Sequence, residues 1–355
     1  MDVDVDERGA ELARGFYEQV VGPILDRAAP RLRYAAARLG SGSDVLGLDD
    51  AMSRDHDWGC RLTLLVDDPG AVAEVDRLLE RELPGRYRGH PVRFPVTWDA
   101  ADTHNVEVAT VAGFARSRLG VDPVAGLTVP GWLCLTGQGV LEVTAGPVFA
   151  DRTETLGPVR EALRWYPPDV GLYVLAAWWR RVSRLMPMVG RTADRGDDLG
   201  SRMLAAKLTA DLMALAFALS GRWAPYGKWR GTVFRGLPVA DDLAGPFERA
   251  LAASGGRERE AALAAAAERL LDEQRALGLP APAAAVAPFW DRPYPGIDDA
   301  VWEGLRAAVR DPEVACLPLG AGSVEQWVDN VDVLTDPARR AVLQAAYLGR
   351  WGEDG

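Results

Sequence analysis

The spacing of apolar residues changes along this chain, and that change limits the folds available to it. Before about residue 110, compact apolar runs such as 61–66 alternate with polar segments and short helical stretches. After residue 155, apolar residues recur every three to four positions over long stretches, as between 197 and 220. Side chains alternate with period two in a strand and period 3.6 in a helix. The sequence therefore predicts an α+β fold, with a small mixed sheet and helices over 1–150 and a larger, mostly α-helical domain over 151–355.

The N-terminal part is expected to begin helix, strand, loop, strand, helix and to end with two more strands. The first helix is expected over 7–27, the first strand over 32–36, the loop over 40–59 and the second strand over 61–66. A helix capped by Asp68 follows, and the last two strands are expected over 91–98 and 105–111. The segment 137–151 is predicted to hold either one more hairpin or a helix end. In the C-terminal part we expect helices over 168–186, 197–220, 248–277 with a break at Gly255-Gly256, 299–309, 324–331 and 337–348, with a Pro-rich connector over 281–296.

The charge balance and the cysteine content exclude several classes of protein. The chain has 40 basic and 51 acidic residues, a net charge of −11. It has no long basic run, which argues against a large nucleic-acid footprint but leaves room for a pocket that holds one nucleotide. Its three cysteines are far apart, which argues against a zinc site or a disulfide framework. The acidic start and the absence of a run of about 20 apolar residues predict a cytoplasmic protein without membrane contact.

Two short motifs carry the chemistry of the N-terminal part. The turn Gly40-Ser41-Gly42-Ser43 is small enough to approach phosphate oxygens and offers backbone N–H groups and hydroxyls. It is followed by Asp55-His56-Asp57. Two aspartates at this spacing on an extended chain point to one side and repel unless a cation lies between them. Mg²⁺ prefers such oxygen ligands and bridges carboxylates to phosphates, so the motifs predict a site for a metal and a phosphate.

Other interpretations of these residues remain open. An isolated Asp-x-Asp is common in turns, where aspartate accepts hydrogen bonds from its own backbone. The acids Asp44, Asp49 and Asp50 either attract a cationic substrate or cap a helix in solvent.

The order of Gly-Ser and Asp-x-Asp, about a dozen residues apart, resembles the signature of the polymerase-β-type nucleotidyltransferase superfamily. Four segments together resemble an uncharacterised bacterial family of nucleotidyltransferase-like proteins: GSGSDVLGLDDAMSRDHDWG, WLCLTGQGVLEVTAGPVFAD, LSGRWAPYGKWRGTVFRGLP and GAGSVEQWVDN. This resemblance implies a nucleotidyltransferase-type sheet in the N-terminal domain. In this chain Trp-Gly follows the two aspartates, so the acids are expected to sit slightly before the strand.

The resemblance also implies roles for single residues. Asp55 and Asp57 would bind Mg²⁺, and a third acid would bind a second metal ion or accept the proton of the attacking hydroxyl. Glu107 has the apolar neighbours expected of that acid, and Asp99 and Glu142 are the alternatives. The turn formed by Gly40, Ser41, Gly42 and Ser43 would hold the phosphates of a nucleoside triphosphate.

A basic and aromatic cluster in the C-terminal part offers a further contact. Lys228 could reach a triphosphate and Trp229 could stack on a base; alternatively, Trp229 belongs to the core and Lys228 is solvated.

Three functions are compared. The first is a Mg²⁺-dependent nucleotidyltransferase that moves NMP from an NTP to a hydroxyl of a small molecule, such as an antibiotic or metabolite, or of a macromolecule. The second is a catalytically silent nucleotide-binding protein of regulatory or toxin–antitoxin type with the same fold. The third, a hydrolase with paired carboxylates, is disfavoured because two acids at one strand end lie too close together for a glycosidase.

Overall fold

The computed structural model describes residues 7–54, 56–97 and 99–348. The chain divides into two compact units, and both are discontinuous in sequence. The first unit comprises 1–127, 139–164 and 335–341, and the second comprises 128–138, 165–334 and 342–355. The expected boundary at residue 150 falls inside the segment 139–164 of the first unit.

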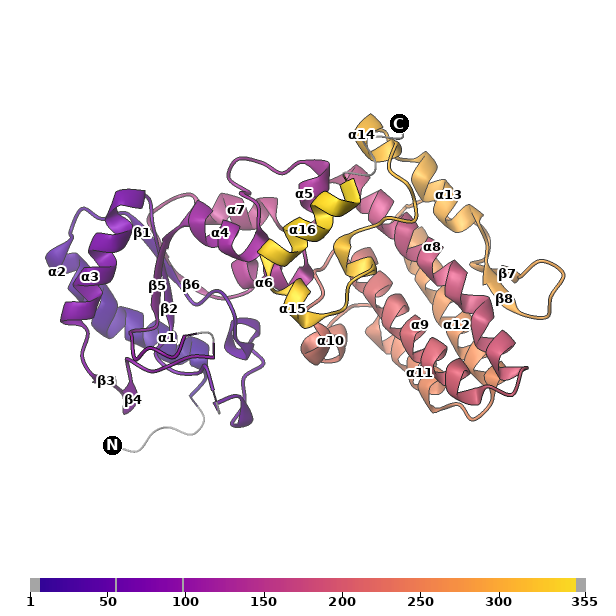
Figure 1. Ribbon diagram of the computed structural model, residues 1–355, viewed down its shortest axis with the longest axis horizontal. Helices are drawn as coiled ribbons and strands as arrows, with labels where there is room; N and C mark the ends of the chain where they lie inside the picture. The colour runs from indigo at the N-terminus through magenta and orange to yellow at the C-terminus, as the bar shows by residue number, and fades with distance from the viewer. Residues whose placement is uncertain (1–6, 55, 98, 349–355) are drawn as a thin grey trace. The chain divides into compact units, whose positions relative to one another are not determined.

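The first unit is built on a four-stranded mixed sheet with the order β5-β2-β1-β6 (Figure 1). Its strands are β1 (Tyr34–Ala37), β2 (Leu62–Val66), β5 (Val106–Thr110) and β6 (Val148–Asp151). The central strand β1 pairs antiparallel with β2 and β6, while β2 pairs parallel with β5. This arrangement confirms the predicted mixed sheet of an α+β fold.

Strand direction brings three chain segments to one edge of this sheet. Because β1 and β2 are antiparallel, the loop that leaves β1 and the residues that enter β2 share an edge. Because β5 is parallel to β2, its first residues lie at that same edge. The register pairs Ala37 with Thr63 and Thr63 with Glu107, so these three side chains form one row on one face of the sheet.

The helices of the first unit supply its core. A continuous helical segment, α1 (Gly9–Phe16), a π-turn (Tyr17–Val21) and α2 (Gly22–Ala28), follows the predicted stripe of apolar residues. Leu12 and Phe16 are fully buried, and they share a core cluster with Leu64 of β2. The remaining helices are α3 (Val72–Glu82), α4 (Val111–Leu119), α6 (Gly137–Thr144) and α7 (Leu156–Ala162).

Two predictions in this unit need correction or completion. The predicted strand over 91–98 is wrong for the described residues. They contribute the end of a short hairpin, β3 (Arg86–Tyr87) with β4 (His90–Pro91), and two isolated bridges. Pro91 and Pro95 lack the N–H that a strand needs for its ladder, which explains the interruption. The segment 137–151 holds a helix, α6, and then strand β6, with no hairpin.

The second unit is mostly helical, as predicted. Its longest helices are α8 (Pro168–Ala193), α9 (Asp198–Leu219), α11 (Ala240–Ala252) and α12 (Gly256–Ala276), which pack side by side (Figure 1). Gly255 is the N-cap of α12, which confirms the predicted break. Shorter elements are α5 (Val129–Leu133), α10 (Gly227–Phe234), α13 (Ala300–Ala307), α14 (Pro312–Ala315) and α15 (Val331–Leu334).

The C-terminal third differs from the prediction in two places. The expected helix over 324–331 is a single 3-10 turn, Val324–Gln326, and α15 begins only at Val331. The Pro-rich connector contains a small hairpin, β7 (Val286–Pro288) with β8 (Pro295–Ile297). The last helix, α16, spans Pro337–Leu348, as predicted. Among the described residues, every helix is too short or too polar to cross a lipid bilayer.

Candidate functional site

The Gly-Ser turn leaves β1 in a conformation that requires glycine. Gly40 has φ +84° and Gly42 has φ +135°, values that side chains rarely adopt. A Cβ at Gly42 would collide with the carboxylate of Asp44 and would lie 2.6 Å from Nη2 of Arg38. The backbone N–H of Gly40 donates to the carbonyl of Glu142 (2.8 Å). The turn is therefore held tightly, and Ser43 begins the 3-10 turn Ser43–Leu46 that follows it.

Arg38 is the buried centre of this loop, and its side chain is 2% exposed. Its Nε donates to Oδ2 of Asp44 (2.7 Å) and its Nη2 donates to Oδ1 of the same residue (2.9 Å), a bidentate ion pair. The same guanidinium donates to the carbonyls of Leu39 (2.5 Å) and Ser41 (2.8 Å). Asp44 is thus the buried partner of an arginine, and neither role expected for it, attraction of a cationic substrate or capping in solvent, describes its contacts.

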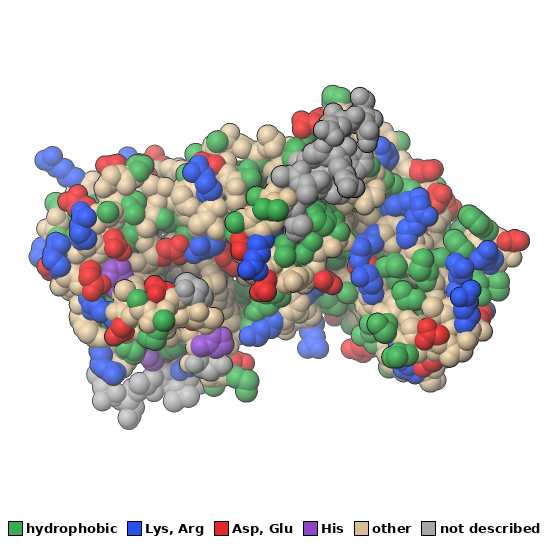
Figure 2. Space-filling view, in the orientation of Figure 1, with side chains coloured by type: hydrophobic (Ala, Val, Ile, Leu, Met, Phe, Trp, Pro, Cys, Tyr) green, Lys and Arg blue, Asp and Glu red, His purple; other side chains and the backbone are tan. Residues whose placement is uncertain are grey.

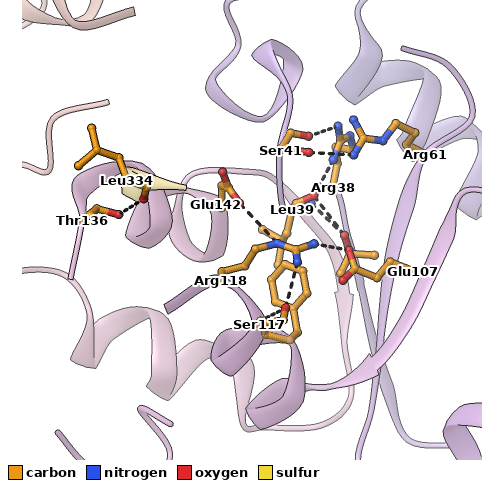
Figure 3. Close-up of polar contacts among 12 residues, drawn as sticks. Arg38, Leu39, Ser41, Arg61, Glu107, Ser117, Arg118, Thr136, Glu142 and Leu334 are labelled. Carbon is orange, nitrogen blue, oxygen red and sulfur yellow. Dashed lines mark hydrogen bonds and ion pairs between the residues drawn. The ribbon is translucent and has the colours of Figure 1, made fainter. Parts of the chain in front are cut away.

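A second buried guanidinium reaches the loop from the residue before β2 (Figure 3). Arg61 donates from Nη2 to Oγ of Ser41 (3.3 Å) and from Nη1 to the carbonyl of Asp57 (3.0 Å). Burial, and then the charge of Arg38, lower the pKa of Arg61 to about 9. The guanidinium stays charged at neutral pH. Neither arginine belongs to a motif that can be recognised in the sequence, although each flanks an apolar strand at the edge where the Gly-Ser turn lies.

Glu107 lies on β5 at this edge, and Arg118 from α4 binds it (Figure 3). Nη2 of Arg118 is 2.6 Å from Oε2 of Glu107, and Nε is 3.4 Å from Oε2 of Glu142. Two of the three candidates for the third acid therefore share one guanidinium. Oγ1 of Thr63, in the row between β1 and β5, donates to the carbonyl of Leu39 (3.3 Å).

The other predicted acids lie in turns. Asp57 has φ +54° and precedes β2 by several residues, so its backbone is not extended. Its two carboxylate oxygens accept hydrogen bonds from the backbone N–H (2.6 Å) and the hydroxyl (2.7 Å) of Thr97. Asp99 accepts from the N–H of Ala101 (2.9 Å), an ordinary aspartate turn. Asp55 lies outside the described residues.

The structure contains carboxylates of the type that binds Mg²⁺, but the described ones do not converge on a common point. Asp57 and Glu107 offer the hard oxygen ligands that the ion prefers, at one edge of the sheet. Both carboxylates are engaged, by Thr97 and Arg118 respectively. Within 7–54, 56–97 and 99–348, no three acidic, His or Cys side chains are grouped so as to hold a metal ion. The described residues alone therefore do not form a magnesium site.

Lys228 belongs to the second unit, where it is the second residue of α10. Its Nζ lies 4.8 Å from the ring centroid of Trp229, and its side chain is exposed. Trp229 is half-buried, which agrees with neither a fully buried core residue nor an open stacking platform.

Comparison with known proteins gives two similarities. Residues 132–230 match the model of a domain of unknown function, DUF4037, which leaves most of the chain outside the match. The fold is similar to the crystal structure of a nucleotidyltransferase-like protein from Exiguobacterium sibiricum, at 15% identity and a TM-score of 0.35, over 76% of this chain and 78% of that one. No curated protein matches the sequence.

Proposed function

We propose that the first unit binds a nucleoside triphosphate at the Gly-Ser turn and transfers its nucleoside monophosphate to a hydroxyl group. The acceptor oxygen would attack the α-phosphorus, and the bond from that phosphorus to the bridging oxygen would break. Pyrophosphate leaves, and the hydroxyl proton passes to a carboxylate or to water. The observation that carries this proposal is the glycine-dependent turn with two buried guanidiniums, Arg38 and Arg61, at the sheet edge that also holds Glu107.

The two arginines support the proposal in different ways. The hydrogen-bonding groups of Arg38 are taken up by Asp44 and the loop carbonyls, so this residue shapes the turn. Arg61 donates to the hydroxyl of Ser41 over a long distance (3.3 Å) and to the carbonyl of Asp57 (3.0 Å), and the Ser41 hydroxyl is itself a suitable phosphate contact. A guanidinium suits bidentate binding of phosphate. We therefore assign Arg61 and Ser41 to phosphate binding and Arg38 to positioning.

The metal is part of the same proposal. Mg²⁺ would be held by Asp55, Asp57 and Glu107 and would offset the charge of the triphosphate. Asp57 would first have to leave Thr97, and Glu107 would have to leave Arg118. The acceptor is a hydroxyl of a small molecule or a macromolecule, and the net charge of −11 disfavours a long nucleic acid.

A second candidate function is nucleotide binding without turnover. The observation that favours it is the ion pair of 2.6 Å between Arg118 and Glu107, which neutralises the best candidate for the third acid. If this pair persists when nucleotide binds, the turn holds phosphate but Glu107 is not available to bind the metal or to accept the proton.

Calorimetry with Mg²⁺ and each of the four NTPs tests the binding step. We expect the wild type to bind at least one NTP and Arg61→Gln to bind it at least tenfold more weakly, since a hydrogen bond to a charged group contributes about 1.5–3 kcal/mol. Arg33→Gln is the matched control, because Arg33 is exposed and pairs with Asp67 in the same unit. Absence of NTP binding by the wild type would refute both candidates.

Pyrophosphate release separates the two candidates. The transferase should release pyrophosphate in the presence of hydroxyl acceptors, and Glu107→Gln should abolish release while NTP binding remains. Asp102→Asn is the control, since it changes an exposed acid outside the predicted set. Tight NTP binding without release across an acceptor panel, equal in the wild type and in Glu107→Gln, would favour the silent binding protein.

A further inference from the structure

The second unit contains a cavity of about 660 Å³ that the proposed function does not use. It is lined by α8, α9 and α13, and by the segment after α14. Every lining residue belongs to the second unit. A volume between about 300 and 1,000 Å³ is usual for sites that hold small ligands.

The wall of this cavity is cationic in a protein that is acidic overall. Five basic side chains line it, against two acidic ones: Arg180, Arg181, Arg184, Lys207 and Arg306, with Asp299 and Glu303. The local balance is five minus two, or +3, whereas the whole chain carries −11. In the space-filling view, Lys and Arg side chains gather over α8 (Figure 2).

The helical spacing concentrates this charge on one face. Arg180 and Arg184 are four residues apart on α8, so their side chains are neighbours and repel each other. Arg181 is neutralised by Asp211 of α9, with Nε 2.9 Å from Oδ2. Within the described part of the chain, neither Arg184 nor Lys207 forms an ion pair of 4 Å or less. An anion in the cavity would supply the missing negative charge.

Aromatic rings lie in the same wall. The ring of Trp302 on α13 is buried, and the guanidinium of Arg180 lies 5.1 Å from its centroid. Trp327 is 40% exposed and lines the cavity from the segment after α14. An exposed indole beside guanidiniums offers a planar ligand a stacking surface next to its anionic group.

We propose that this cavity binds a phosphorylated small molecule with a planar ring, of about the size of a mononucleotide. Arg184 and Lys207 bind the phosphate, and Trp327 contacts the ring. Once Asp211 is counted against Arg181, the local balance is five minus three, or +2, which suits a doubly charged group better than a single carboxylate. A nucleic-acid strand fits less well, because the chain is acidic overall. The site is independent of the nucleotide site proposed in the first unit.

Calorimetry of the full chain with AMP, in EDTA to remove divalent cations, tests this site. We expect AMP to bind the wild type, and the double variant Arg184→Gln/Lys207→Gln to bind it at least tenfold more weakly. Arg195→Gln/Arg235→Gln is the matched control, since both arginines are exposed in the second unit and lie outside the cavity. Both pairs of substitutions are at or near the surface, and circular dichroism checks that each variant is folded.

Two further titrations examine the ring and the location. Ribose 5-phosphate should bind more weakly than AMP to the wild type, and Trp327→Leu should reduce that difference. Arg61→Gln in the first unit should bind AMP as the wild type does, whether or not the NTP site exists. The proposal is overturned if AMP fails to bind, if the double variant keeps full affinity, or if Arg61→Gln loses it. Tighter binding of a single-stranded oligonucleotide than of AMP would overturn the small-molecule assignment.

Discussion

Arg38 shows how a single buried charge organises the Gly-Ser turn. Its guanidinium is 2% exposed, and it joins the carboxylate of Asp44 to the carbonyls of Leu39 and Ser41. A charge at this depth is tolerated only when its hydrogen-bonding groups have partners. The turn and the ion pair therefore depend on each other.

Removing one partner of this pair should be costly. We expect Arg38→Gln to lower the free energy of unfolding by about 3–5 kcal/mol, because Asp44 is left as an uncompensated buried charge. Urea denaturation measures the change. Arg33→Gln, which breaks an exposed pair with Asp67, should cost no more than about 1 kcal/mol. Equal effects of the two variants would contradict the role assigned to Arg38.

The glycines of the turn allow a sharper comparison. Gly42→Ala should cost more than about 2 kcal/mol and weaken NTP binding, because φ is +135° and the new Cβ meets Asp44 and Arg38. Gly47→Ala also has a positive φ, +67°, but its Cβ meets nothing within 4 Å, so about 1 kcal/mol is expected. Urea denaturation and calorimetry on both variants separate the cost of the positive φ, present in both, from the cost of the steric clash, present only in Gly42→Ala. NTP binding that survives Gly42→Ala unchanged would count against the turn as the phosphate site.

At the scale of elements, α8 and α12 approach each other closely in the second unit. Gly190 of α8 lies so near the carboxylate of Glu260 that a Cβ would overlap it. Glu260 is 3% exposed, and its ion pair with Arg257 spans 3.0 Å. Desolvation raises the pKa of Glu260 above its ordinary value. Glycine lets these two helices pack with a carboxylate between them.

Adding a methyl group at this crossing should separate the helices. We expect Gly190→Ala to destabilise the protein by about 1–3 kcal/mol through overpacking. Gly231→Ala is the control, because Gly231 is exposed in α10 and its Cβ would meet nothing within 4 Å. That substitution should stabilise by about 0.5–1 kcal/mol, from helix propensity. Thermal denaturation by circular dichroism compares them, and a stabilised Gly190→Ala would refute the close packing.

At the scale of the whole molecule, the first unit is completed by distant parts of the chain. α7 lies beyond residue 150, and Leu156, Val159 and the residue that follows the helix, Leu163, are buried. Arg340, from the segment 335–341, is 1% exposed and donates to the carbonyl of Arg118 (2.9 Å). The predicted boundary at residue 150 follows the change in the spacing of apolar residues. It would separate α7 and the segment 335–341 from the sheet of the first unit.

Fragments test this division directly. We expect a fragment 1–164 to be more stable than 1–150, because each buried Leu or Val side chain contributes about 1.5–3 kcal/mol. Three such residues amount to a large part of the 5–15 kcal/mol that is usual for a domain. Amide dispersion in NMR spectra and urea denaturation compare the two fragments. If 1–150 is as stable as 1–164, α7 is not part of the first unit.

The sequence by itself determined the long helices of the second unit and the positions of strands β1, β2 and β5 along the chain, because both depend on local periodicity. It placed the Gly-Ser turn correctly as a loop after the first strand, since glycine and serine favour turns for local reasons. It overestimated the strand at 91–98 and the helix at 324–331, where the backbone forms only bridges and a single turn.

Only the tertiary structure decided what each polar residue contacts. Arg38 and Asp44, Arg118 and Glu107, and the basic wall of the cavity in the second unit are brought together by packing between elements. A buried charged side chain needs a hydrogen-bonding or oppositely charged partner. Which side chains become buried depends on how the whole chain is arranged, so the spacing of residues in the sequence does not predict these pairs. The Gly-Ser motif therefore predicted a loop beside a strand, but only the fold showed that Arg38 and Arg61 contact this loop.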